Sequence, residues 1–128
     1  MRVLVDTHAW LWWTADVDRL GSAARAALED PETTILVSMA TSWEIAILVE
    51  LNRIALDEPV EAYMARELGK AGVEVLPIAP HHLGQLVRLP RHHRDPFDRL
   101  LIAQALSEGV PLVTADRQAP AYGVSILW

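Results

Sequence analysis

The sequence contains no cysteine and a single lysine among its 128 residues. Without cysteine, the chain can form neither a disulfide framework nor a zinc–thiolate site, and it is compatible with a reducing compartment. The one lysine, Lys70, follows no expected strand. Its position argues against enzymes that require a catalytic lysine at the end of a strand.

The chain also lacks long apolar runs. Only three apolar residues follow Met1-Arg2 before Asp6 interrupts them, so no secretory signal is expected. No uninterrupted apolar run approaches the roughly 18 residues of a membrane-spanning helix. We therefore expect a soluble, cytoplasmic protein.

The residues that are present favour one globular domain over residues 1–128. Hydrophobic residues make up 52% of the chain and charged residues 22%, which is typical of a packed core. The formal net charge of −6 by itself argues against binding to nucleic acid. One basic strip departs from this average, because residues 88–99 hold four arginines with His92 and His93 between them. The strip could contact phosphate groups.

Short apolar runs alternate with helical patterns along the chain. The apolar runs predict strands near residues 3–5, 34–38, 73–76, 111–114 and 124–127. Helical patterns cover roughly residues 8–13, 22–29, 41–52, 59–71, 80–87 and 96–108. Continuous rather than alternating apolar runs favour strands that are covered on both faces. The sequence therefore predicts an α/β fold, a three-layer α/β/α sandwich with a central parallel sheet of four to five strands.

Two acids follow expected strands, at the sheet edge where sites form in open parallel sheets. Asp6 ends the first strand and Asp116 follows the fourth. Taken alone, Asp6 could be the N-cap of the next helix, and Asp116 could be a cap or a loop residue.

Two further acids, Glu44 and Asp98, stand in the first turns of expected helices. Thr41 and Glu44 fit a capping box with Thr41 as N-cap, but Glu44 also heads an apolar stripe of Ile47, Leu48 and Leu51. Asp95 and Pro96 suit the N-cap and N1 positions, and Asp98 heads a stripe of Leu101, Ile102 and Ala105. A carboxylate on a core-facing stripe needs a partner, because burying it unpaired costs several kcal/mol.

These four acids together predict a metal centre formed by Asp6, Glu44, Asp98 and Asp116. Adjacent carboxylates repel one another unless a cation compensates their charge. Oxygen ligands without cysteine or histidine favour a hard ion, Mg²⁺ first and Mn²⁺ next. Three nearby hydroxyls could orient a water molecule there, those of Thr7, Ser38 and Thr114.

The remaining polar and aromatic residues receive simpler interpretations. We interpret Asp95 as a cap, and the pairs His81-His82 and His92-His93 as solvated surface residues without a matching ligand set. The chain is rich in tryptophan, and three within four positions of one helix cannot all face inward. An exposed tryptophan would mark a partner surface.

Several motifs together resemble a PIN domain. They are Asp6-Thr7-His8, Ser38 followed by Trp43-Glu44-Ile45, HHRDPFDRLLIAQA at 92–105 and LVTADR at 112–117. The resemblance runs from the first expected strand to the last, and DPFDRLLIAQA is its most specific part. More narrowly, the chain resembles the VapC-type toxins of type II toxin–antitoxin pairs.

This resemblance implies a metal-dependent endoribonuclease that cleaves transfer RNA or ribosomal RNA and thereby inhibits translation. By motif position, the family's metal-binding acids correspond to Asp6, Glu44, Asp98 and Asp116, and all are present. It also implies a homodimer and a cognate VapB-like antitoxin that silences the pocket. Arg91, Arg94 or Arg99 could hold the RNA backbone.

Two other classes of function remain open at this point. A small-molecule phosphatase of the haloacid-dehalogenase type also begins with an aspartate after the first strand. It needs a second aspartate two residues later, where this chain has His8, and a phosphoacceptor receiver domain would need the missing strand-end lysine. A non-catalytic PIN-like module that only binds RNA or protein is the second alternative.

Overall fold

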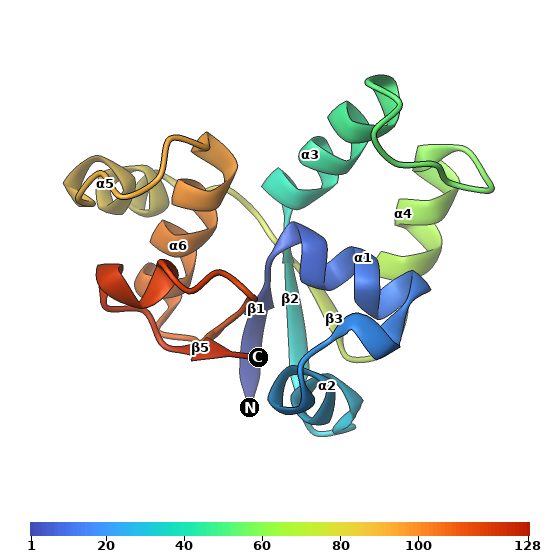
Figure 1. The fold of residues 1–128 in the computed structure, drawn as a ribbon, viewed down its shortest axis with the longest axis horizontal. Coiled ribbons are helices and arrows are strands. Elements are labelled where there is room, and N and C mark those ends of the chain that lie inside the picture. Colours follow the sequence, from blue (N-terminus) through green and yellow to red (C-terminus); the bar gives the residue numbers. More distant parts are fainter.

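A five-stranded parallel sheet forms the centre of the computed structural model, which describes residues 1–128 (Figure 1). The order across the sheet is β3 (Val73–Leu76), β2 (Thr34–Ser38), β1 (Arg2–Val5), β4 (Leu112–Val113) and β5 (Ile126–Leu127). All four neighbouring pairs are parallel. The predicted α/β class and the parallel sheet are confirmed.

Alternate residues of β1 point into two separate cores. Val3 and Val5 pack in a core with four helices: α1 (Thr7–Ala15), α2 (Ser22–Glu29), α3 (Met39–Glu50) and α4 (Val60–Leu68). Leu4, between them, packs in a second core with α5 (Pro80–Arg88) and α6 (Pro96–Glu108). Because successive side chains of a strand face opposite sides, the two cores lie on opposite faces of the sheet. The predicted three-layer sandwich is confirmed, and Figure 1 shows the two groups of helices on either side.

The last two strands are shorter than predicted. β4 covers only Leu112–Val113 and β5 only Ile126–Leu127. Pro111 has no amide hydrogen to donate to a neighbouring strand, so β4 begins after it. Two 3₁₀ helices, Val17–Arg19 and Ala119–Tyr122, complete the fold. No helix in the structure combines the length and the apolar character needed to cross a bilayer.

Helix α3 begins earlier than predicted, because β2 leads directly into it. Ser38 is the N-cap, and its hydroxyl accepts a hydrogen bond from the amide of Ala40 at 3.1 Å. The capping box proposed for Thr41 is therefore wrong. Thr41 is fully buried inside the helix, where its hydroxyl oxygen lies 3.3 Å from that of Thr7.

The predicted inward stripes are correct for α6 and wrong for α3. Leu101, Ile102 and Ala105 of α6 are all buried. In α3 the buried residues are instead Ala40, Thr41 and Ile45, and Leu51 is 55% exposed. Glu44 is therefore half-buried at the margin of the core, and its environment comes from tertiary neighbours.

The strand order reverses at β1. Strands β2 and β3 are added on one side of β1, and β4 and β5 on the other. In open parallel sheets a crevice forms where the order reverses, beyond the carboxyl ends of the strands. Here that point lies between β1 and β4, which pair through Leu4 with Leu112 and Val5 with Val113. Asp6 and Asp116 follow these two strands, so the topology itself brings them to one place.

Candidate metal centre

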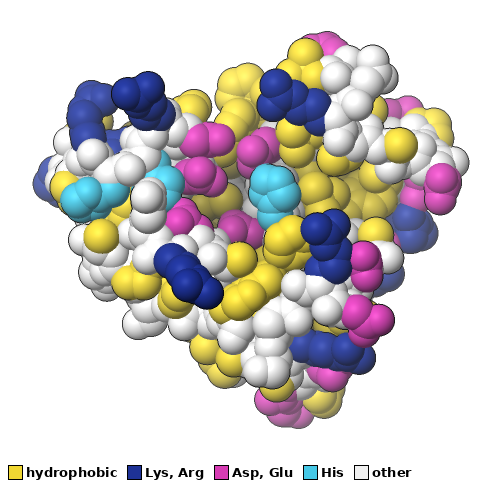
Figure 2. Space-filling model, in the orientation of Figure 1, with side chains coloured by type: hydrophobic (Ala, Val, Ile, Leu, Met, Phe, Trp, Pro, Cys, Tyr) yellow, Lys and Arg dark blue, Asp and Glu magenta, His cyan; other side chains and the backbone are white.

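A small cavity lies at the reversal point of the sheet. Its polar lining consists of Asp6, Asp98, Asp116 and Thr114, and its volume is about 10 Å³. This is about the smallest volume that accommodates one water molecule. Figure 2 shows acidic side chains gathered around a hollow in the middle of this face, with histidine beside them and arginine farther out.

Asp6 acts both as a helix cap and as a wall of this cavity. Its carboxylate accepts a hydrogen bond from the amide of Ala9 at 2.7 Å, which caps α1. Burial raises the pKa of Asp6, and the charge of Asp116 raises it further, against the opposing effects of Thr114 and the Ala9 amide. The cap is thus compatible with a second role.

Glu44 and Asp98 face the same concentration of negative charge. Burial raises the pKa of Glu44, Asp95 and Asp6 add to the effect, and the Thr7 hydroxyl, which donates to Glu44 at 2.5 Å, opposes it. Burial also raises the pKa of Asp98, to about 6, with further contributions from Asp95, Glu44 and Asp116. The negative charges of these acids therefore interact across the carboxyl edge of the sheet.

The structure does not bring the four predicted acids equally close. Asp6, Asp98 and Asp116 share the cavity wall, whereas Glu44 lies outside that wall. Its effect on the pKa of Asp98 nevertheless places it at the same edge. Asp95 has the predicted role of N-cap of α6, accepting from the amides of Phe97 at 2.8 Å and Asp98 at 3.4 Å.

The hydroxyls have assigned partners as well. Thr7 donates to Glu44, Ser38 caps α3, and the Thr114 hydroxyl accepts from the amide of Asp116 at 3.0 Å. Each one fixes a backbone turn or a carboxylate at the sheet edge. Their hydrogen bonds hold the acids in place.

His93 belongs to this centre, so its interpretation as a solvated residue is wrong. Its side chain is only 9% exposed, and its Nε2 lies 2.5 Å from Oδ2 of Asp116. Its Nδ1 lies 2.8 Å from the hydroxyl of Tyr122, which also accepts from the amide of His92 at 3.0 Å. In the simplest arrangement Tyr122 donates to Nδ1 and Nε2–H donates to Asp116. His93 then orients a carboxylate and is not itself a free ligand.

His82 was also wrongly assigned to the solvated surface. It is 1% exposed, and its Nδ1 accepts from the amide of Ala79 at 2.9 Å. Its Nε2 lies 3.0 Å from Oε2 of Glu108, which the exposed His81 also approaches, at 3.1 Å. These two hydrogen bonds lower the pKa of Glu108. Because its Nδ1 lone pair is used, the neutral ring carries its hydrogen on Nε2, so this group joins α5 to α6 and is unsuited to bind a metal ion.

The tryptophans divide as the helical spacing predicts. Trp10 is fully buried, whereas Trp12 and Trp13 are half-buried. Trp43 is 65% exposed, and its ring packs edge-on against Phe97 at a centroid distance of 5.4 Å. Trp43 and Phe97 directly precede Glu44 and Asp98 in the sequence, so the exposed aromatic pair borders the acidic edge.

Comparison with known proteins gives matches along almost the whole chain. The model of the PIN domain family matches residues 3–124. Over 118 residues the chain is 39% identical to Ribonuclease VapC22 of Mycobacterium tuberculosis. The aligned region covers 91% of this chain and 88% of that protein.

Solved structures share the fold at lower sequence identity. The crystal structure of VapBC2 from Rickettsia felis, bound to a DNA fragment from its promoter, superposes with a TM-score of 0.72 at 13% identity, covering 98% of this chain and 97% of that chain. VapC20 of Mycobacterium tuberculosis, described as a sarcin–ricin loop cleaving toxin, gives a TM-score of 0.65 at 20% identity, covering 95% of each chain. At these identities the structural similarity supports the fold alone.

Proposed function

The chain belongs to the PIN-domain family, and from this premise we propose that it is a metal-dependent endoribonuclease, the toxin of a type II toxin–antitoxin pair. The 39% identity to a VapC ribonuclease supports this activity. One observation on the chain itself carries the proposal: Asp6, Asp98 and Asp116 line one cavity at the reversal point of the sheet, with Glu44 at the same edge, and the pKa values of Asp6, Glu44 and Asp98 are raised there. Burial is the largest cause of these shifts and repulsion between the acids adds to it, so a bound cation would offset both costs.

The proposed metal ligands are Asp6, Glu44, Asp98 and Asp116. The donor set fits a hard divalent cation, because it offers carboxylate oxygens beside a cavity of about 10 Å³. Mg²⁺ is our first choice and Mn²⁺ our second. A bound divalent cation supplies Lewis acidity toward a phosphodiester oxygen and lowers the pKa of a water molecule.

The chain's own contribution is to position these carboxylates. Thr7 holds Glu44 through a 2.5 Å hydrogen bond, and the amide of Ala9 fixes Asp6. His93 fixes Asp116 and is itself held by Tyr122. The other oxygen of Asp116 accepts from the amide of Gln118 at 2.8 Å, so the orientation of this carboxylate is fixed at both ends. Carboxylates held in this way preorganise the site.

For the substrate, we propose structured cellular RNA of the transfer or ribosomal class, whose cleavage would inhibit translation. VapC20, which shares the fold, is described as cleaving the sarcin–ricin loop. We further propose that residues 1–128 act as a single PIN-like domain in a homodimer, silenced by a VapB-like antitoxin. The relatives of known structure include toxin–antitoxin complexes, which supports such a partner.

The test is cleavage of a total pool of transfer and ribosomal RNA by the purified, antitoxin-free protein. Reactions would contain Mg²⁺, Mn²⁺ or EDTA, and would be repeated with Asp98→Asn. We expect discrete fragments that require a divalent cation and disappear in the variant. Asp57→Asn is the matched control, because Asp57 is an exposed acid in the loop between α3 and α4.

Either of two results would contradict the proposal. Fragments that persist in EDTA or in Asp98→Asn would remove the metal centre from the reaction. Intact RNA beside a folded, metal-binding protein would instead favour the non-catalytic binding module.

A further inference from the structure

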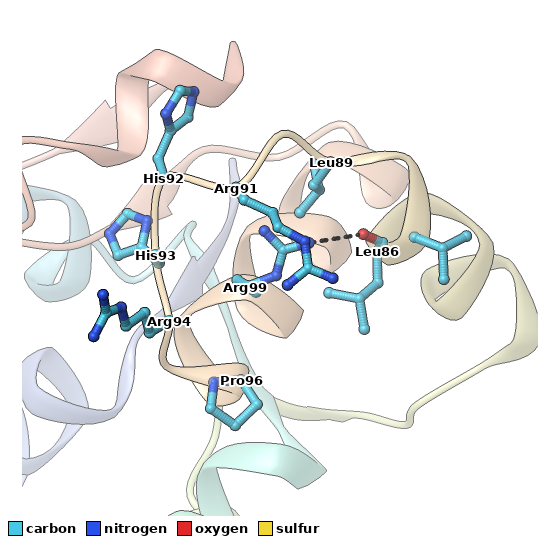
Figure 3. A pocket seen from close by; sticks show the side chains of 9 residues that line it. Leu86, Leu89, Arg91, His92, His93, Arg94, Pro96 and Arg99 are labelled. Carbon is cyan, nitrogen blue, oxygen red and sulfur yellow. Dashed lines mark hydrogen bonds between the residues drawn. The ribbon is translucent and has the colours of Figure 1, made fainter.

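A second hollow lies beside the acidic centre, between the end of α5 and the start of α6 (Figure 3). Its volume is about 780 Å³, far larger than the cavity between the acids. Three arginines and two histidines are among its nine lining residues, and no acid is. We call it the cationic hollow. In a chain of net charge −6, such a lining marks a local reversal of sign.

The positive charge of the cationic hollow is not neutralised within the chain. Arg91 and Arg94 are exposed, and neither forms an ion pair, whereas Arg25 and Arg66 are each paired with acids. Figure 3 shows the side chains of Arg91 and Arg99 extending toward Leu86 in the same part of the hollow. Two guanidinium groups facing one region without a carboxylate favour the binding of an anion.

Arg99, unlike Arg91, is held by hydrogen bonds to backbone carbonyls. Its guanidinium donates to the carbonyl of Pro90 at 2.7 Å and to that of Leu86 at 3.3 Å. Leu86 lies in the last turn of α5, and its carbonyl also accepts from the amide of the C-cap residue Leu89 at 3.2 Å. Arg99 therefore closes the end of α5 and shapes the hollow, while Arg91 retains its donors for a ligand.

The hollow and the acidic centre share one residue. His93 lines the hollow, and its Nε2 contacts Asp116. Tyr122 anchors this part of the chain through the amide of His92 and the ring of His93. A ligand that reaches the acidic centre from this side must therefore pass directly by the hollow.

We propose that the cationic hollow binds a phosphodiester group of single-stranded RNA adjacent to the cleaved bond, with Arg91 as its main contact. This inference rests on the proposed ribonuclease function. An RNA strand held at the acidic centre has to continue past it, and four carboxylates repel its phosphates, so adjoining unpaired cations are needed to hold the strand. The apolar side of the hollow, which includes the 81% exposed Val87, offers a surface for a sugar or base.

The test measures binding separately from cleavage. A fluorescently labelled single-stranded RNA is titrated with Asp98→Asn protein, with and without Arg91→Gln, between about 50 and 200 mM salt. We expect Arg91→Gln to weaken binding about tenfold, as for loss of one charged hydrogen bond. The slope of log affinity against log salt should fall by about 0.7, the value for one phosphate of a single strand.

Arg53→Gln is the matched control, because Arg53 is exposed, unpaired and outside the hollow. It should leave affinity and slope unchanged, and Arg91→Lys should restore the slope. If Arg91→Gln binds RNA with unaltered affinity and slope, the proposal is overturned. It is equally overturned if the substitution weakens only a labelled polyglutamate peptide, since the hollow would then serve an acidic protein segment.

The two proposals fail in different ways. RNA binding that depends on Arg91, together with no cleavage by the unsubstituted protein, would refute the ribonuclease and leave the hollow as an RNA site. Cleavage that requires Asp98 but RNA binding that ignores Arg91 would have the opposite meaning.

Discussion

Two groups of acids and histidines lie on the α5–α6 side of the molecule, and they differ in the balance of charge. At the sheet edge, one histidine, His93, meets Asp98 and Asp116, with further acids close by. Between α5 and α6, two histidines, His81 and His82, meet the single acid Glu108. The pKa of Asp98 is raised to about 6, whereas that of Glu108 is lowered.

This difference separates a candidate binding site, the group at the sheet edge, from a structural contact, the group around Glu108. A carboxylate outnumbered by hydrogen-bond donors is already satisfied, so the group around Glu108 needs no ligand. The carboxylate of Asp98, by contrast, accepts no hydrogen bond from the chain and lies beside other acids, so it remains unsatisfied and attracts a cation. Similar residue types within similar distances can therefore have unrelated roles. Their surroundings distinguish them: Asp98 is partly buried beside other acids, whereas Glu108 is hydrogen-bonded to two histidines.

The largest expected effect is on cleavage. Asp6→Asn should reduce the initial rate of RNA cleavage by more than about a hundredfold, because it removes a proposed ligand, and loss of an outer partner alone typically costs 10- to 100-fold. Asparagine still caps α1 well, so the fold should be retained. Glu108→Gln, at the other group, should leave the rate unchanged. Equal losses in the two variants would erase the distinction between the groups.

A smaller effect is expected when the orienting histidine is replaced. His93→Gln should lower the cleavage rate by about 10- to 100-fold and raise the Mn²⁺ concentration required for half-maximal activity. His81→Gln is the control from the other group and should change neither quantity. A reduced rate with an unaltered Mn²⁺ requirement would show that His93 does not act through the metal centre.

Substitutions in the two groups should have the opposite order of effect on the free energy of unfolding, with the larger loss in the group around Glu108. His82→Ala should lower the free energy of unfolding by about 1–3 kcal/mol, because the Ala79 amide and Glu108 lose a partner. Asp98→Asn, measured in EDTA by the same denaturant titration, should leave stability unchanged or raise it, since one of several repelling charges disappears. A marked loss of stability in Asp98→Asn would mean that this carboxylate is already satisfied in the chain.

The smallest effect concerns pH. The pKa of Glu108 is lower in the folded chain than its ordinary value of 4.5, so the unfolded chain binds more protons there. Its stabilising contribution is present above about pH 4.5 and is lost as pH falls through the lowered pKa. The difference in unfolding free energy between the unsubstituted protein and Glu108→Gln should shrink accordingly. A difference that stays constant with pH would mean that the ionised carboxylate is not what holds α5 to α6.

Much of the fold was predictable because its signals are local. The apolar runs located all five strands, and Asp95 with Pro96 marked the start of α6. The prediction failed where a tertiary contact outweighed local chemistry. Thr41 suits an N-cap, yet it lies inside α3, where its hydroxyl meets that of Thr7 from another element.

The residues of the candidate site likewise fall into those that local sequence signals could place and those that only tertiary contacts place. The sequence by itself determined that Asp6 and Asp116 would converge, because the carboxyl ends of parallel strands meet at one edge of a sheet. It likewise supplied the first-turn positions of Glu44 and Asp98. These placements require only knowledge of where each strand or helix ends.

Only the tertiary structure decided what the histidines do. His93 meets Asp116, and His82 meets Glu108, across 23 and 26 residues of sequence respectively. Such contacts depend on how α5 packs on α6 and on where Tyr122 anchors the segment before α6. No local pattern encodes that packing, because it results from the burial of apolar faces that many residue combinations can supply. The sequence therefore determined where the negative charge gathers, and the packing of the helices decided which histidine serves it.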